Sequence, residues 1–153
     1  MKKNGFTLLE TLAVVAMTGI LAASAFNGYS RHLNKKDEAQ ATKLMYEVAQ
    51  KLEHHRSDNF TYEGFTPVTL VSPEGATRDK IKYNITIHDG SGDNPEINAS
   101  GAVGREYIIR AVSTSSARHS YLYTSTGKRC KNKTSGRVSY TGCGTKAQGA
   151  STW

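Results

Sequence analysis

The chain has 153 residues, enough for about one globular domain, and its 37% apolar and 22% charged residues are ordinary for such a domain. It contains no GxSxG, HExxH or phosphate-binding glycine loop, and no convergent cysteine–histidine arrangement. Those motifs hold the nucleophiles, metals and phosphates of many enzymes, so we expect no catalytic residue, no metal site and no cofactor.

The first element in chain order is an apolar segment, residues 6–26, with Glu10 as its single charge. As a helix at 1.5 Å per residue it would be about 32 Å long, close to the thickness of a bilayer's hydrocarbon core. Lys2 and Lys3 precede it, and the positive-inside rule keeps that end in the cytoplasm. We therefore expect a single-pass membrane helix with the rest of the chain on the far side. A secretory cleavage site in the small-residue run 22–25 is the alternative.

At the start of this segment, Gly5 to Glu10 read GFTLLE directly after a short basic leader. The motif resembles the GFTLIE cleavage site of type IV prepilins. The resemblance implies that a prepilin peptidase cuts between Gly5 and Phe6 and methylates the new amine of Phe6.

The same resemblance implies a division of the chain into three parts. Residues 1–5 are the leader, residues 6–29 the transmembrane and filament-core helix, and residues 30–153 the globular pilin domain. The expected partners are other pilin subunits in a helical filament. The expected location is the bacterial inner membrane before assembly and a cell-surface pilus (a fimbrium) afterwards, where pili serve cell adhesion and twitching motility.

Glu10 needs a reason to lie within an apolar span, because a carboxylate there costs about 2.5–3.5 kcal/mol on insertion scales. The nearest cation after cleavage is the amine of Phe6, and in the family this glutamate neutralises the amine of a neighbouring subunit. We predict such an assembly role; the alternative is a side chain that reaches the headgroups near the start of the helix.

Two positions depart from the commonest form of the family. Thr11 stands where an aliphatic residue usually follows the glutamate, and Asn27 stands where many major pilins have a proline. Without the proline the helix lacks its usual cause of a kink. Both departures favour a minor pilin, of the PilE-like sort, over a bulk filament protein.

Beyond Tyr29 the helix becomes amphipathic. Apolar residues recur at three- and four-residue steps, at Leu33, Ala41, Leu44, Val48 and Leu52. The periodicity predicts one helix from about residue 6 to residue 55, ending before Ser57, with its outer half packed on a sheet.

The remainder predicts an antiparallel sheet. Residues 57–80 read as a connecting loop, and residues 81–88, 106–113 and 119–125 read as strands. A short segment bearing Cys130 follows, and residues 138–140 are a candidate for a last strand. The order resembles the α+β pilin fold, a long N-terminal helix on an antiparallel β-sheet with a disulfide-closed C-terminal loop.

Cys130 and Cys143 are the only cysteines. An even count on the exported side of a membrane favours one disulfide, with two free buried thiols as the alternative.

Positive charge is concentrated near these cysteines. Within a net charge of +7, residues 104–153 contain nine Lys or Arg and one acid, Glu106. Five basic residues surround Cys130: Lys128, Arg129, Lys131, Lys133 and Arg137. Such side chains bind phosphate backbones, so they are candidate DNA-binding residues; the alternative is that they solvate the domain or dock on acidic neighbouring subunits.

Three functions fit these features. The first is a minor pilin needed for pilus assembly. The second is a receptor pilin for DNA uptake in natural transformation, displaying the basic loop. The third is a pseudopilin of a type II secretion system. Pseudopilins more often use calcium-binding loops, and the acidic turn at Asp89, Asp93 and Glu96 does not have the spacing of a recognised calcium loop.

Overall fold

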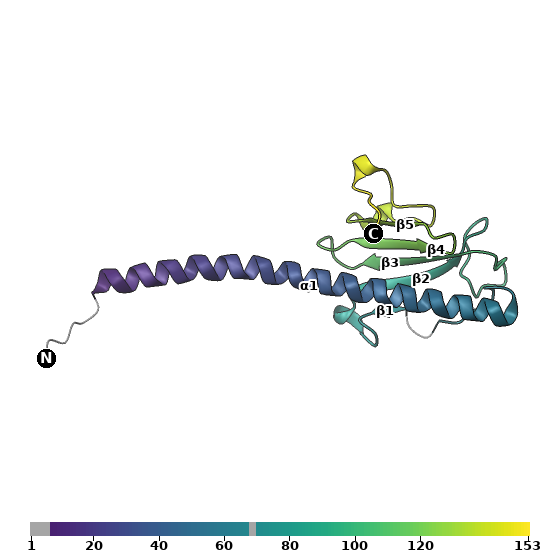
Figure 1. The fold of residues 1–153 in the computed structure, drawn as a ribbon, viewed down its shortest axis with the longest axis horizontal. Coiled ribbons are helices and arrows are strands. Elements are labelled where there is room, and N and C mark those ends of the chain that lie inside the picture. The colour runs from purple at the N-terminus through teal and green to yellow at the C-terminus, as the bar shows by residue number, and fades with distance from the viewer. Residues whose placement is uncertain (1–6, 68–69) are drawn as a thin grey trace. The chain divides into compact units, whose positions relative to one another are not determined.

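The structure is a computed structural model that describes residues 7–67 and 70–153 (Figure 1). The predictions for Gly5 and Phe6 lie outside the described residues. By its internal contacts the chain divides into two compact units, Met1–Lys35 and Lys36–Trp153.

Helix α1 spans Leu8–Asn59. The hydroxyl of Thr7 accepts a bond from the backbone N–H of Glu10 at 3.3 Å, so a side chain satisfies one of the N–H groups left unpaired at a helix start. The predicted end near residue 55 was one turn too early. Polar residues that usually favour a turn instead bond back onto the helix here: Asn59 donates to the carbonyl of His55 at 2.9 Å, and His54 pairs with Asp58 at 3.0 Å.

The second unit contains a five-stranded antiparallel sheet in the order β1-β2-β3-β4-β5 (Figure 1). The strands are β1 Val71–Ser72, β2 Tyr83–Asp89, β3 Tyr107–Ser113, β4 Ser120–Thr124 and β5 Arg129–Asn132. Each strand pairs with its neighbour in sequence, so the sheet is a simple meander. The predicted α+β fold, a long helix with an antiparallel sheet, is confirmed.

Two details of the predicted sheet were wrong. β1 was read as part of a loop, because two residues are too few to show an alternating pattern. Residues 138–140 form no strand: Ser139 donates its N–H to the carbonyl of Gly142 at 2.8 Å, which closes a turn, and Val138 is buried below that turn.

The main core lies between α1 and one face of the sheet. The helix contributes the predicted positions Ala41, Leu44, Val48 and Leu52, and β2 contributes alternate residues such as Ile85. Burying side chains of this size is the largest favourable term in folding, roughly 1.5–3 kcal/mol for each large one. The apolar stripe after residue 36 therefore explains why this part of α1 belongs to the globular unit.

A second, smaller core lies on the opposite face of the sheet. Ile108, Leu122, Val138 and Cys143 are buried there together, beneath the segment that follows β5. At the end of the chain, Trp153 packs against Tyr121 on the helix side. Its indole N–H donates to the carbonyls of Leu122 and Cys130 at 3.3 and 3.1 Å.

Candidate functional site

In the first unit, α1 presents apolar side chains along almost its whole exposed surface. Leu9 is 79% exposed and Phe26 71%. Within the described residues this is the one helix long and apolar enough to cross a membrane; its most apolar window of 18 residues has a mean hydropathy of 1.8 and no buried residue. An exposed surface of this kind needs lipid or other protein chains around it.

The hydroxyl groups of this segment bond to the helix itself. Thr11 donates to the carbonyl of Leu8 at 2.8 Å, Thr18 to that of Val15 at 2.9 Å, and Ser24 to that of Ile20 at 3.1 Å. A hydroxyl satisfied in this way adds little cost in an apolar environment. Thr11, although unusual for the family, therefore remains compatible with burial in lipid or in a bundle of helices.

Glu10 lies in the first turn of α1, with its side chain exposed. An acid at this position interacts favourably with the positive end of the helix dipole. No ion pair forms on Glu10 within the described part of the chain, and the amine of Phe6 lies outside that part. Its carboxylate is thus open to a cation from elsewhere.

The predicted disulfide is confirmed, with Cys130 of β5 bonded to Cys143 at 2.04 Å. The segment it closes is also held by the buried side chain of Asn132. The amide of Asn132 donates to the carbonyls of Cys143 and Gln148 at 2.9 and 3.0 Å, and its oxygen accepts the N–H of Thr134 at 2.9 Å. Asn132 was not singled out from the sequence, because nothing in its neighbours shows which distant carbonyls it will meet.

The structure separates the five candidate DNA-binding residues. Arg129 donates to the hydroxyl of Tyr46 on α1 at 3.0 Å, so it lies on the helix side of the sheet. Lys131 shares that side, since alternate residues of a strand face the same way. Lys128 and Arg137 lie elsewhere, together lining a depression beside the disulfide. Lys133 lines a third place, next to the turn after β3.

Within the depression, Lys128 donates to the carbonyl of Thr141 at 2.6 Å, and the hydroxyl-bearing residues Ser139 and Thr141 line the same surface. This pair of cations with neighbouring hydroxyls retains the chemistry that binds a phosphate. The depression therefore concentrates two of the five predicted residues.

A pair of charged contacts joins α1 to the β3–β4 turn within the second unit. Arg118 is buried and donates to Asp37 at 3.0 Å, and its neighbour His119 bonds to Glu38 through both its backbone N–H and its ring, at 2.8 and 2.9 Å. Burial would raise the pKa of Glu38, but the bonds from His119 outweigh it and hold that pKa below its ordinary value. No local pattern in the sequence predicts this clasp of Asp37, Glu38, Arg118 and His119, because the partners are 81 residues apart.

Asp89, considered above as part of an acidic turn, is completely buried. Its carboxylate accepts the backbone N–H groups of Ser91 at 2.9 Å and Gly104 at 2.8 Å, and a third from Val103. Burial would raise the pKa of Asp89, but these donors outweigh it and lower the pKa. Asp89 thus organises the long β2–β3 connection. Among the described residues, no group of three or more His, Cys, Asp and Glu is placed to hold a metal.

Comparison with known proteins agrees with the helix and the fold. A model of the prokaryotic N-terminal methylation motif matches residues 1–26, which puts the chain in the class of N-terminally methylated proteins. It is similar to fimbrial protein Q of Moraxella bovis (29% identity, covering 58% of this chain and 61% of the relative). It is also similar to fimbrial protein EcpB of Eikenella corrodens (30%; 63% and 56%) and to the type IV major pilin protein PilE1 of Neisseria gonorrhoeae (25%; 58% and 41%).

The chain belongs to the type IV pilin family. It spans less than two thirds of the length of each of these relatives. No solved structure matches it.

Proposed function

We propose that this protein is a type IV pilin that assembles through α1 into a helical pilus filament. The observation that carries the proposal is the methylation motif at the start of a helix whose first half is apolar and exposed. Such a helix is stable in the inner membrane before assembly, with its N-terminus in the cytoplasm, and in a bundle of other subunits afterwards. Both environments remove the same apolar surface from water.

In this proposal a prepilin peptidase cleaves after Gly5 and methylates Phe6. Glu10 then pairs with the N-terminal amine of a neighbouring subunit. The exposed carboxylate of Glu10, without an ion pair in the described part of the chain, supports this role. The pairing matters because a lone carboxylate in an apolar bundle is costly.

Processing and assembly can be separated by two variants of the full-length chain in the producing cell. Gly5→Leu should leave an uncleaved precursor in the membrane, because the bulky side chain blocks the peptidase. Glu10→Gln should be cleaved normally but should be strongly depleted from sheared filaments, because it has lost the charge that pairs with the amine. Mass spectrometry of the N-terminus and immunoblots of sheared pili measure the two steps. Normal processing of the Gly5→Leu variant would refute the cleavage site.

We infer that the protein is a minor rather than a major subunit. Thr11 and the absence of a proline at position 27 support this, and α1 runs through that position without interruption. One relative is named a major pilin, so copy number is the deciding measurement. Quantitative mass spectrometry of purified filaments should find this chain well below the most abundant pilin.

DNA binding is the second candidate, favoured by Lys128 and Arg137 in the depression beside the disulfide. Replacing both with alanine should weaken binding of duplex DNA by the full chain in detergent and lower the salt dependence of binding. The slope of log affinity against log salt should become shallower by about one for each phosphate that the variant no longer neutralises.

Arg129 and Lys131 provide the matched control, because they carry the same charge on the helix side of the sheet. Their double alanine variant should bind DNA more tightly than the Lys128/Arg137 variant, and replacing all five basic residues should abolish binding. If the wild-type chain does not shift DNA at low salt, this second candidate is eliminated and the filament proposal is unaffected.

A further inference from the structure

Phe60 is the first residue after α1, and its side chain is 91% exposed. Its φ of 61° lies in the left-handed region, which a residue with a β-carbon adopts at a cost and glycine adopts freely. Its N–H closes the helix on the carbonyl of Arg56 at 2.7 Å, a bond that glycine would also make. The folded domain therefore gains no packing from this ring and bears a strained backbone to display it.

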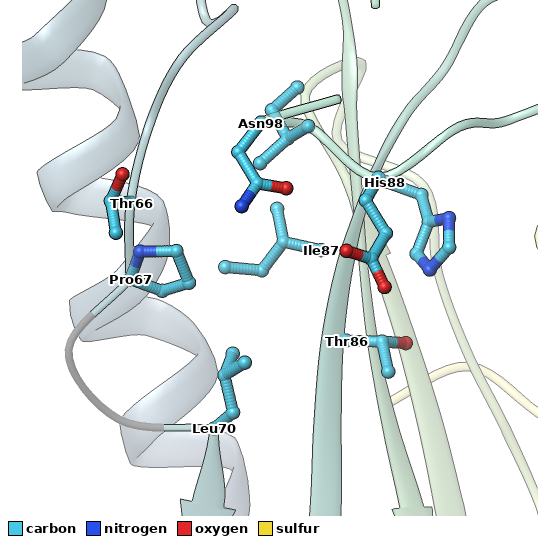
Figure 2. A pocket seen from close by; sticks show the side chains of 9 residues that line it. Thr66, Pro67, Leu70, Thr86, Ile87, His88 and Asn98 are labelled. Carbon is cyan, nitrogen blue, oxygen red and sulfur yellow. The ribbon is translucent and has the colours of Figure 1, made fainter. Parts of the chain in front are cut away.

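A pocket of about 160 Å³ opens elsewhere on the second unit, beside β2. Figure 2 shows Ile87 projecting from β2 toward Pro67 and Leu70 across this space. These residues and Ile97 provide an apolar lining, while His88 and Asn98 lie at its polar side. Leu70 is 41% exposed, so a large apolar surface in the pocket remains uncovered.

The sizes of the two features match. An apolar cavity of roughly 150 Å³ is large enough to bind benzene, and the pocket is about 160 Å³. A phenyl ring therefore fits it. Phe60 does not fill the pocket of its own chain, because almost all of its surface is exposed.

We propose that Phe60 of one subunit inserts into the pocket lined by Pro67, Leu70, Ile87 and Ile97 on the next copy of the chain. The proposal rests on the filament function given above and specifies a contact between globular domains within it. The ring and the pocket are different surfaces of one chain, so the contact is heterologous: each copy gives a ring to one neighbour and accepts a ring from another. Contacts of this type that do not close on themselves build helical filaments.

Cysteine cross-linking tests the contact in filaments made by cells. The double variant Phe60→Cys/Leu70→Cys, oxidised in sheared pili, should give a ladder of multimers larger than the dimer on a non-reducing gel. The matched control is Phe60→Cys/Val103→Cys, because Val103 is also exposed, at 53%, but does not line the pocket. It should give no ladder. Efficient dimers from Phe60→Cys alone would show a symmetric contact between rings and would overturn the proposal, as would assembled filaments of the double variant that do not cross-link.

A second pair of variants tests the contact without new cysteines. Phe60→Gly should unfold at the same or a higher temperature than the wild type and yet yield severalfold fewer sheared pili. Phe60→Leu, which keeps an apolar side chain, should restore most of that yield. Wild-type yield from Phe60→Gly overturns the proposal. Absence of the wild-type chain from sheared filaments is a different result, and it refutes the filament function itself.

Discussion

Replacing Asp37 with alanine should lower the free energy of unfolding of the globular unit by about 3 kcal/mol, because it leaves a buried guanidinium without its carboxylate. The Arg118 side chain is only 8% exposed in its pair with Asp37. It would keep neutral partners alone, the hydroxyls of Ser113 and Thr114 at 3.4 and 3.3 Å. The single tryptophan, Trp153, packs in this unit, so its fluorescence during urea denaturation reports the change.

An exposed ion pair on the same helix provides the control. Lys43 and Glu47 are 3.3 Å apart, with side chains 78% and 44% exposed, and Glu47→Ala should cost no more than about 0.5 kcal/mol. Adding Arg118→Met to the Asp37→Ala variant should recover part of the loss, since no buried charge then remains unpaired. Equal effects of Asp37→Ala and Glu47→Ala would mean that burial of the clasp does not stabilise the fold.

Asp89→Ala should cost a similar amount, again about 3 kcal/mol, since it leaves several buried backbone N–H groups without an acceptor. The β2–β3 connection should then open and exchange its amide hydrogens faster, at Val103 and Gly104 first. Asp93→Ala is the matched control in the same turn, because Asp93 is exposed and should change the stability by less than about 0.5 kcal/mol. Unchanged exchange at Gly104 in Asp89→Ala would show that the carboxylate does not hold the turn.

Asp89 also makes stability depend on pH. Its pKa in the folded state is lowered, so the unfolded state binds the proton more tightly. Its contribution is fully present above the unfolded pKa of about 3.9 and is lost as the pH falls through the lower folded value. Glu38, whose pKa is also lowered, acts in the same direction. The wild type should therefore lose stability below about pH 4, and Asp89→Ala should show a shallower loss over that range.

The periodic parts of the fold were predictable from local sequence. The apolar stripe of α1 at Ala41, Leu44 and Val48 and the alternation in β2 each repeat at the period of one element, so the buried face can be identified before the fold is known. The disulfide was predictable because two cysteines in an exported chain have one pairing. β1 and the turn at residues 138–140 were not, since pairing of so few residues depends on what lies beside them.

The candidate site was predictable only in part. Lys128 and Arg129 are adjacent in sequence, yet they lie in different surroundings: Arg129 reaches Tyr46 on α1, while Lys128 reaches Thr141 beside the disulfide. A count of basic residues carries no information about this, because it ignores which side of the strand each one occupies. The same limit applies to Phe60, whose exposure depends on where the helix stops.

The sequence by itself determined the family and the apolar character of the first half of α1, because a contiguous motif and a contiguous apolar segment need no distant partner to be recognised. The tertiary structure alone decided which charges are buried, as in Asp37 with Arg118, and which basic residues share a surface. It also decided that Asp89 holds a turn and that an aromatic ring and an apolar pocket are left uncovered. These properties depend on contacts between residues far apart in the chain, and such contacts exist only after the helix and the strands have packed.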